Sequence, residues 1–224
     1  MDQHLAEGFA QRFNITVEHV VREAYEMLLL RRLCESRLGR SLVFKGGTAL
    51  RLAYGSPRFS DDLDFSASGS IPTEMFVAIL RTLGKGVPQV EVVEALAKRF
   101  TVFALFKASE AYLPQAFSIK TEISTRSEAW EPGRDFELRL LTSDFTNVTA
   151  LAQVATLDRM WEDKQKALAA RKQSRDLYDL WFIAQKLRRE FSPDLAGFDR
   201  KAIKRELRKY PPQSHWGAIE QWSE

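Results

Sequence analysis

Apolar side chains recur at helical spacing near the start of the chain. Between residues 16 and 38 they are three or four positions apart, which is the pattern of a helix with one apolar face. We therefore expect a long helix there, capped by Asn14 or Thr16 and ended by Gly39. The order of apolar and polar residues further along predicts a strand at 41–44, a short helix at 48–54, a strand at 62–66 and a helix at 72–83.

The middle of the chain has the composition of strands and the end has the pattern of helices. Strands are expected at 90–97, 100–107, 117–125 and 136–141, although 91–99 is also compatible with a helix. Helices are expected at 157–171, 174–186 and 199–209, with Thr156 and Ser174 as caps and Pro211-Pro212 as the final stop. The composition shifts near Ala150, so we predict an α/β (α+β) protein with a core at 1–150 and a helical subdomain at 151–224.

Composition places the chain among soluble proteins. Its 224 residues suffice for one core with a helical subdomain, and 45% hydrophobic and 28% charged residues are ordinary values. No apolar run reaches the roughly 18 residues that a membrane span needs, and no signal-peptide pattern follows Met1. The single cysteine, Cys34, excludes an intramolecular disulfide and a multi-cysteine zinc site. We expect a cytoplasmic protein without a membrane partner.

The positive charge gathers near the C-terminus. The net charge is +3, but residues 186–209 contain nine Lys or Arg against four acids. Such a patch suits a nucleic-acid backbone, whereas a solvated helix face is the alternative explanation. The nine are Lys186, Arg188, Arg189, Arg200, Lys201, Lys204, Arg205, Arg208 and Lys209.

The strand at 62–66 carries two carboxylates. Strand periodicity places Asp62 and Asp64 on one face, while Leu63 and Phe65 point into the core. Two adjacent carboxylates repel each other unless a cation lies between them, and hard oxygen ligands suit Mg²⁺. The alternative is a polar strand end that caps a turn.

A small-residue turn precedes that strand. Gly46 and Gly47 let the backbone approach a ligand closely, and the helix N-terminus that follows suits a phosphate. Thr48 would add a hydroxyl donor, and Lys45 would contact phosphate or pair with the acids. The turn and the carboxylates together predict a site for a metal-bound nucleoside triphosphate (NTP).

Polar residues between the turn and the strand are further candidates for nucleotide binding. These are Ser56, Arg58 and Ser60. The planar guanidinium of Arg58 suits phosphate, whereas a salt bridge to Asp61 or Asp62 is the alternative. Lys164 and Arg171 are two helical turns apart and so share one helix face.

These motifs resemble those of the AbiEii/AbiGii-type nucleotidyltransferase toxins, which belong to the DNA polymerase β-like superfamily. The resemblance rests on residues 46–48, 54–60 and 62–64, and on a second block that contains Asp163-Lys164, Arg171 and the run from Arg175 to Asp179. It covers roughly residues 43–182. One departure is Gly-Thr in place of the more frequent Gly-Ser.

The resemblance implies roles for particular residues. It implies a polymerase β-like core, in which Glu122 is the acid of a later strand that completes a two-Mg²⁺ site with Asp62 and Asp64 or acts as general base. An exposed strand residue is the alternative for Glu122. The resemblance further implies that Lys164 neutralises the triphosphate and that Asp176 orients Lys164 or the nucleotide. Asp179 is on nearly the same helix face as Asp176, and the sequence does not separate their roles.

The implied activity is transfer of a nucleoside monophosphate from an NTP to an RNA hydroxyl, with release of pyrophosphate. The resemblance points to the toxin of a toxin–antitoxin or abortive-infection pair, to the tRNA 3′ acceptor end as target, and to an antitoxin encoded alongside. Three alternatives remain open: modification of a protein hydroxyl, a non-catalytic nucleotide-binding regulator, and a metal-dependent nuclease.

Overall fold

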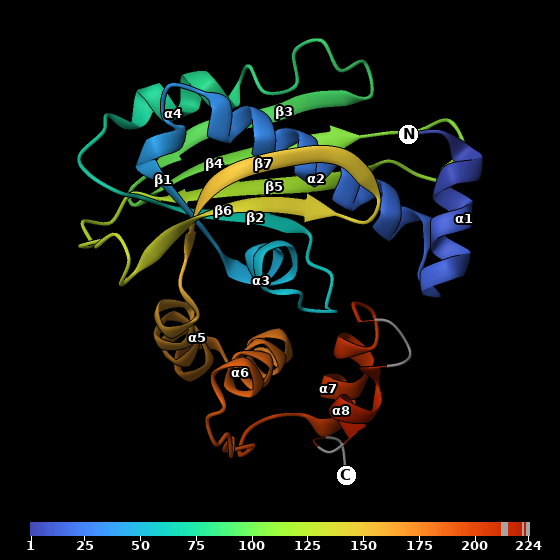
Figure 1. The fold of residues 1–224 in the computed structure, drawn as a ribbon, viewed down its shortest axis with the longest axis vertical. Helices are drawn as coiled ribbons and strands as arrows, with labels where there is room; N and C mark the ends of the chain where they lie inside the picture. Colours follow the sequence, from blue (N-terminus) through green and yellow to red (C-terminus); the bar gives the residue numbers. More distant parts are fainter. Residues whose placement is uncertain (212–214, 221, 223–224) are drawn as a thin grey trace.

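A mixed β-sheet forms the centre of the protein (Figure 1). The structure is a computed structural model that describes residues 1–211, 215–220 and 222. Within these residues the sheet has seven strands in the order β3-β4-β5-β2-β1-β7-β6. The strands are β1 (Leu42–Lys45), β2 (Asp62–Ala67), β3 (Val90–Lys98), β4 (Thr101–Ala108), β5 (Phe117–Ser124), β6 (Phe136–Ser143) and β7 (Thr146–Ala155).

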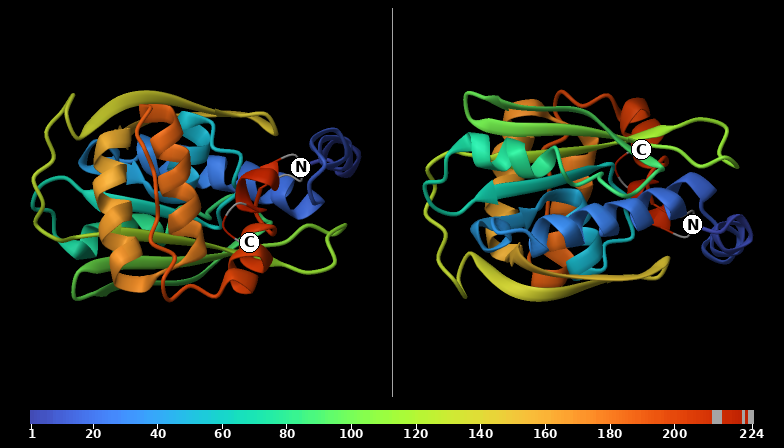
Figure 2. Two further views of the ribbon diagram at one scale, coloured as in Figure 1. Left: turned by 90° about the horizontal axis from the view of Figure 1, so that it is seen from below. Right: turned by 90° about the horizontal axis from the view of Figure 1, so that it is seen from above.

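Helices cover both faces of this sheet. Figure 2 shows α2 and α4 on the face seen from above, and α5 and α6 across the face seen from below. In Figure 1, α3 lies between the sheet and the C-terminal helices. The helices are α1 (Gln3–Phe13), α2 (Val17–Glu35), the short 3₁₀ helix η1 (Gly39–Ser41), α3 (Gly46–Tyr54), α4 (Thr73–Leu80), α5 (Leu157–Arg171), α6 (Ser174–Leu187), α7 (Arg200–Leu207) and α8 (Gly217–Glu220).

The register of the central strands brings distant charged residues together. Strand β2 pairs antiparallel with β1 and parallel with β5. Asp64 therefore lies opposite Lys45 on one side and Glu122 on the other, and Asp62 lies opposite Lys120. Because alternate residues of a strand share a face, the polar residues of β2 and β5 form one surface while Leu63 and Phe65 are buried.

The apolar interior is divided into two clusters. The main cluster fills the space around the sheet and includes Phe182 and Ile183 of α6. A smaller cluster joins α6 to α7 and consists of Leu177, Tyr178, Ile203, Leu207 and Trp222. Helix α6 is therefore buried on two sides.

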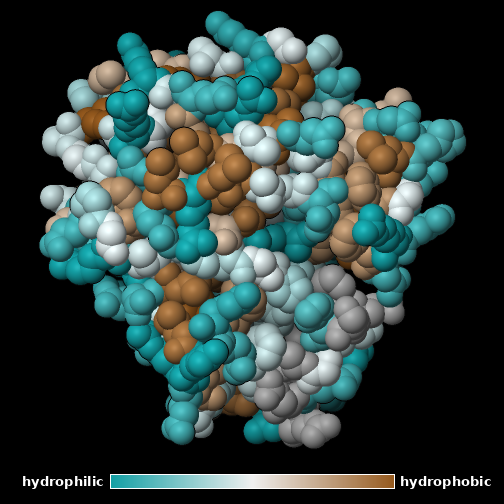
Figure 3. Space-filling view, in the orientation of Figure 1, coloured by the Kyte–Doolittle hydropathy of each residue, from teal (hydrophilic) through white to brown (hydrophobic). Residues whose placement is uncertain are grey.

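An apolar area lies on the surface over β6 and β7. Leu138 and Leu140 of β6 and Leu151 of β7 are exposed at the edge of the sheet. Figure 3 shows a hydrophobic area over these strands, one of several on this face. Among the residues that the structure describes, no helix has the length and apolar character needed to cross a membrane.

Most predicted elements are confirmed, with bounds shifted by a few residues. The helix predicted at 157–171 is α5 itself, and the side chains of Thr16 and Thr156 cap α2 and α5. The segment 91–99, left open between strand and helix, lies in β3. The structure adds α1 and β7, which the pattern did not predict. The predicted subdomain boundary at Ala150 falls within β7, and the helical portion begins at Leu157.

Two helix-end predictions are wrong. Helix α2 ends at Glu35 rather than at Gly39, and the Ser36 hydroxyl donates to the Leu33 carbonyl there. Gly39 instead starts η1, where a Cβ atom would collide with the Cys34 carbonyl. Ser174 is the first residue of α6 and not its cap, because its hydroxyl donates to Glu206. The predicted stop at Pro211-Pro212 includes Pro212, which lies outside the described residues.

Candidate active site

The glycines after β1 allow the start of α3 to approach β2 closely. Gly46 has a φ of 85°, in the left-handed region that favours glycine, and a Cβ atom there would come within 2.6 Å of Asp64 Oδ2. A Cβ atom on Gly47 would collide with the Arg58 guanidinium and lie 2.8 Å from Ser60 Oγ. Only glycine therefore lets the helix N-terminus, which suits an anion, lie directly beside Asp64.

The β2 carboxylates lie beside this turn. The Thr48 hydroxyl is buried and donates to the backbone carbonyl of Asp62 at 2.6 Å, which ties α3 to β2. This bond is a structural contact, and the contact of Thr48 with phosphate stays a prediction. Burial and the neighbouring Asp62 carboxylate raise the pKa of Asp64 to about 6. A carboxylate of this kind gains from a nearby cation.

Lys120 of β5 supplies one such cation. Its Nζ lies 3.1 Å from Asp62 Oδ2 and 3.4 Å from Glu122 Oε2. Burial opposes its charge, yet Asp62 and Glu122 raise the pKa of Lys120 above its ordinary value. Glu122 lies next to Asp64 in register, as the resemblance implied, but its carboxylate turns to Lys120. Within the described part of the chain, no three His, Cys, Asp or Glu side chains are arranged to hold a metal ion, and the three-carboxylate set stays a prediction.

Two buried acids of α6 hold Lys164. Its Nζ lies 2.9 Å from Asp176 Oδ1 and 2.6 Å from Asp179 Oδ2, and both carboxylates are fully buried. Arg171 donates to Asp176 through two bonds of 2.7 and 2.9 Å. Burial would raise the pKa of Asp176, but Arg171 and Lys164 lower it below its ordinary value. The predicted shared face of Lys164 and Arg171 is confirmed by their common partner.

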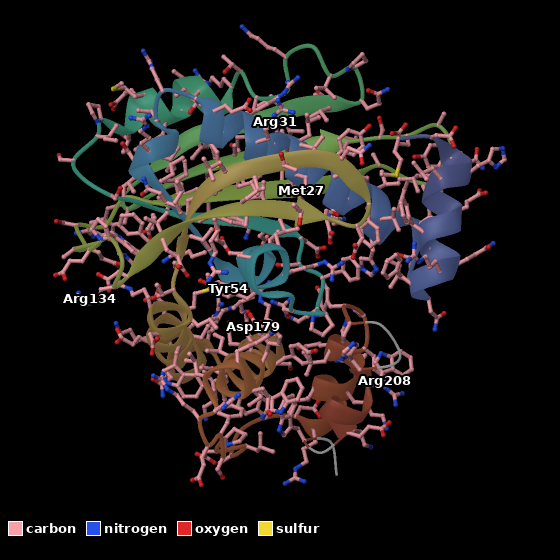
Figure 4. The ribbon with its side chains drawn as sticks, in the orientation of Figure 1. Met27, Arg31, Tyr54, Arg134, Asp179 and Arg208 are labelled. Atoms are coloured by element: carbon pink, nitrogen blue, oxygen red, sulfur yellow. The ribbon has the colours of Figure 1, made fainter. Side chains whose placement is uncertain are left out.

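Arg58 is also held by Asp179. Its guanidinium donates to both carboxylate oxygens at 2.8 and 2.9 Å, and Arg58 is 2% exposed. The partner is therefore Asp179, rather than the Asp61 or Asp62 proposed as an alternative, and the guanidinium is enclosed in protein. Ser56 is buried and its Oγ accepts from the Arg58 backbone N–H. Ser60 follows α3 in the chain, and its side chain lies next to Gly47 at the start of that helix. Figure 4 labels Asp179 at the junction between α3 and α6.

A pocket of about 500 Å³ opens among these elements. Its wall combines anionic Asp64 and Glu122 with several cations. From the predicted set it contains Lys45, Gly46, Asp64, Glu122, Lys164 and Arg171. It also contains Arg126, which sequence reasoning missed, and Asp163, which the motif block included without a role and which pairs with Lys45 at 3.4 Å. The other predicted site residues lie outside the lining: Gly47, Thr48, Ser56, Arg58, Ser60, Asp62 and Asp176.

Comparison with protein families decides the identity of the chain. Residues 28–216 match the family described as "Nucleotidyl transferase AbiEii toxin, Type IV TA system". The chain belongs to this AbiEii toxin family. It is accordingly a nucleotidyltransferase, and its family is that of toxins from type IV toxin–antitoxin systems.

Solved structures share the fold of this AbiEii chain. MenT4, a nucleotidyltransferase toxin from Mycobacterium tuberculosis, aligns with a TM-score of 0.63 and 18% identity over 100% of this chain and 88% of its own. JHP933 from Helicobacter pylori aligns with a TM-score of 0.58 and 22% identity over 86% of this chain and 78% of its own. No curated protein sequence matches the chain.

The AbiEii site joins an anionic centre to a cationic wall. Asp64 lines the pocket, with Asp62 two residues before it on β2, and Lys164 and Arg171, both held by Asp176, line it as well. Such a division suits a ligand that carries both a metal ion and several phosphates. Because Asp176 and Asp179 neutralise part of the charge and lock the Lys164 ammonium, the wall is preorganised before any ligand arrives.

Proposed function

We propose that this AbiEii-family chain transfers a nucleoside monophosphate from an NTP to an RNA 3′ hydroxyl, with Mg²⁺ as cofactor. The observation that carries the proposal is the shared pocket of Asp64, the Gly46 turn and Lys164. The NTP is the donor and pyrophosphate is the leaving group. The acceptor we propose is the tRNA 3′ end, and the partner we propose is an antitoxin encoded alongside.

The residues present fit Mg²⁺. Asp62 and Asp64 offer hard oxygen ligands. Burial first, and then the neighbouring Asp62 carboxylate, raise the pKa of Asp64, and a divalent cation would relieve the repulsion between the two acids. Lys120 Nζ, 3.1 Å from Asp62 Oδ2, already places positive charge there. We propose Asp62 and Asp64 as the holding residues, with Glu122 able to join them if its contact with Lys120 is released. Bound Mg²⁺ would neutralise charge on the reacting phosphate oxygens.

The remaining residues of the pocket act on the nucleotide. The free N–H groups at the start of α3 bind phosphate oxygens, which Gly46 allows to come close to Asp64. Lys164, fixed by Asp176 and Asp179, stabilises the negative charge that leaves with pyrophosphate. Arg171 and Lys45 add positive charge on the same wall. The protein thus contributes positioning and electrostatics, which dominate phosphoryl-type transfer.

An RNA acceptor is supported by the basic C-terminal portion. Helix α7 exposes Lys201 and Arg205, and Lys204 is partly exposed beside them. Contacts from such residues to phosphates supply affinity that does not depend on sequence. A protein acceptor would not need this surface. We place the enzyme in the cytoplasm, where both NTPs and tRNA are present.

The test is incorporation of label. The purified protein is incubated with total tRNA, Mg²⁺ and each α-³²P-labelled NTP in turn, and the products are resolved on a sequencing gel. We expect labelled, lengthened tRNA with at least one NTP. The variant Asp64→Asn, which keeps the size of the side chain, should lower incorporation at least about 100-fold, in line with loss of an electrostatic group in the reaction centre.

Each other result identifies a different function. Label in protein instead of RNA would show that the acceptor is a protein hydroxyl and would overturn the RNA proposal. Shortened RNA would indicate a nuclease. Binding of NTP and Mg²⁺ without pyrophosphate release would contradict the transfer reaction itself.

A further inference from the structure

Two cations contact Asp62 from outside the pocket. Lys120 Nζ lies 3.1 Å and Arg175 NH1 3.9 Å from the same oxygen, Asp62 Oδ2. Neither residue lines the pocket that Asp64, Lys45 and Lys164 share. Asp62, which does not line the pocket either, therefore holds a second group of positive charge next to the pocket cations.

These outer cations are more exposed than Lys164 inside the pocket. The side chains of Lys120 and Arg175 are 32% and 39% exposed, whereas that of Lys164 is 12% exposed and lies between two buried acids. Lys120 and Arg175 share a single Asp62 oxygen, and at 3.9 Å the pair with Arg175 is a loose one. Each keeps a second contact, Lys120 with Glu122 at 3.4 Å and Arg175 with Gln173 at 2.8 Å, so each can exchange Asp62 for a phosphate at modest cost.

Nucleotidyl transfer requires the acceptor to approach from a defined side. The attacking and leaving oxygens lie roughly in line across the reacting phosphorus. If the triphosphate lies along the pocket wall with Lys164, the acceptor must enter across the carboxylates, where Lys120 and Arg175 lie. We propose that Lys120 and Arg175 bind the phosphodiester backbone of the acceptor strand next to its terminal hydroxyl. This inference rests on the proposed function in taking RNA as the acceptor.

The surface continues from these residues toward the basic helix. The backbone carbonyl of Tyr210 accepts from the Phe59 N–H, in the segment that leads into Asp61 and Asp62. Tyr210 follows α7 directly, whose lysines and arginines extend the positive charge away from the reaction centre. A single strand of RNA would follow a continuous path from α7 to Asp62, and an arginine fork is well suited to its phosphates.

The test uses RNA binding without NTP or metal, so that catalysis does not enter. Affinity for a short single-stranded RNA with a free 3′ hydroxyl is measured by fluorescence anisotropy in EDTA at several salt concentrations. The single variants are Arg175→Gln, Lys120→Gln and Asp62→Asn. The double variants combine Asp62→Asn with Arg175→Gln or with Lys120→Gln. Arg31→Gln is the matched control, because Arg31 is an exposed arginine of α2 that Figure 4 labels far from Asp179.

The proposal fixes the sign of the coupling. In the wild type Asp62 competes for both cations, so Arg175→Gln should weaken binding only about 3-fold. In the Asp62→Asn background Arg175 NH1 no longer faces a carboxylate, although Nε still donates to Gln173. The same change should then weaken binding about 10-fold and reduce the salt slope by about 0.7, the value for one phosphate contact with a single strand. Lys120→Gln should follow the same trend, while Arg31→Gln should change neither quantity in either background.

Equal, small effects of Arg175→Gln, Lys120→Gln and Arg31→Gln in both backgrounds would overturn the proposal. Circular dichroism melts show whether each variant is folded, and two independent cations keep the test open if one variant is not. Absence of label transfer together with the expected coupling would overturn the proposed activity and leave this RNA-binding site standing. Label transfer to RNA without the coupling would overturn this RNA-binding site and leave the proposed activity standing.

Discussion

At the scale of single residues, Asp179 has the largest structural role in the site. Its carboxylate is fully buried and contacts both Arg58 and Lys164. Arg58 belongs to the segment between α3 and β2, and Lys164 belongs to α5. One side chain of α6 therefore connects the segment between α3 and β2 to the lysine that we assign to the triphosphate.

The first prediction concerns removal of this charge. Asp179→Asn leaves two cations buried with a neutral partner, so we expect the free energy of unfolding to fall by about 3 kcal/mol. Burial would raise the pKa of Asp179, but Arg58 and Lys164 lower it from 3.8 to about 2. A depressed carboxyl pKa stabilises the folded state above the unfolded value and loses that effect as the pH falls through the folded value. Urea titrations should thus show the largest difference above pH 4, shrinking toward pH 2.

Asp163→Asn is the control for this prediction. Asp163 also pairs with a lysine of the site, Lys45, but its side chain is 25% exposed and the pair is 3.4 Å long. We expect a loss below about 1 kcal/mol, as for a solvated ion pair. An Asp179→Asn protein as stable as Asp163→Asn at pH 7 would contradict the role given to Asp179.

At the scale of elements, local signals predicted the part of the fold that forms the site. The unit β1–α3–β2 follows from glycines, a helix stop and strand alternation, all within about 25 residues of sequence. The elements that the pattern missed bury mainly small residues. Helix α1 buries Ala6 and Ala10, and β7 buries Ala150 and Ala152. Alanine burial gives little hydrophobic periodicity, so neither element stands out in the sequence.

The candidate site shows the same division between local and distant information. Asp62, Asp64 and the glycine turn were identified from neighbouring residues and lie together in the structure. The partners of Arg58 and Asp62 lie far along the chain, in α6 and β5, and depend on the strand register and on the packing of α6. No local pattern specifies them. For this reason the contacts of Lys120 and Arg175 with Asp62 emerged only with the structure.

The second prediction compares two glycines in helices. Gly46→Ala forces a Cβ atom toward Asp64 Oδ2 at a positive φ, so we expect activity to fall at least about 100-fold and the free energy of unfolding to fall by about 1–2 kcal/mol. Gly8 of α1 is exposed and has no atom within 4 Å of an added Cβ. Gly8→Ala should therefore stabilise the protein by about 0.5–1 kcal/mol and leave activity unchanged. Incorporation of label and urea titration measure both effects. Equal activity of the two variants would rule out close approach at Gly46.

At the scale of the whole molecule, the two apolar clusters divide stability unevenly. The main cluster contains the sheet together with one side of α6, and the smaller cluster joins the other side of α6 to α7. The acids of α6 lie between these clusters, where Lys164 and Arg58 reach them. The catalytic wall is thus anchored in the main core, while the basic helix that we assign to RNA is attached through the smaller one.

The third prediction follows from this attachment. Leu207 is fully buried in the smaller cluster, and Leu207→Ala should leave a cavity that costs about 2–4 kcal/mol. Because that cluster is small and separate, we expect the loss to appear as local opening, in which amides of α7 lose hydrogen-exchange protection while those of β2 and β5 keep theirs. RNA affinity should fall with α7, and NTP affinity should remain within about 2-fold. Uniform loss of protection across α7 and the sheet would instead show that both clusters unfold as one unit, and the separation of RNA binding from nucleotide binding would then have no structural basis.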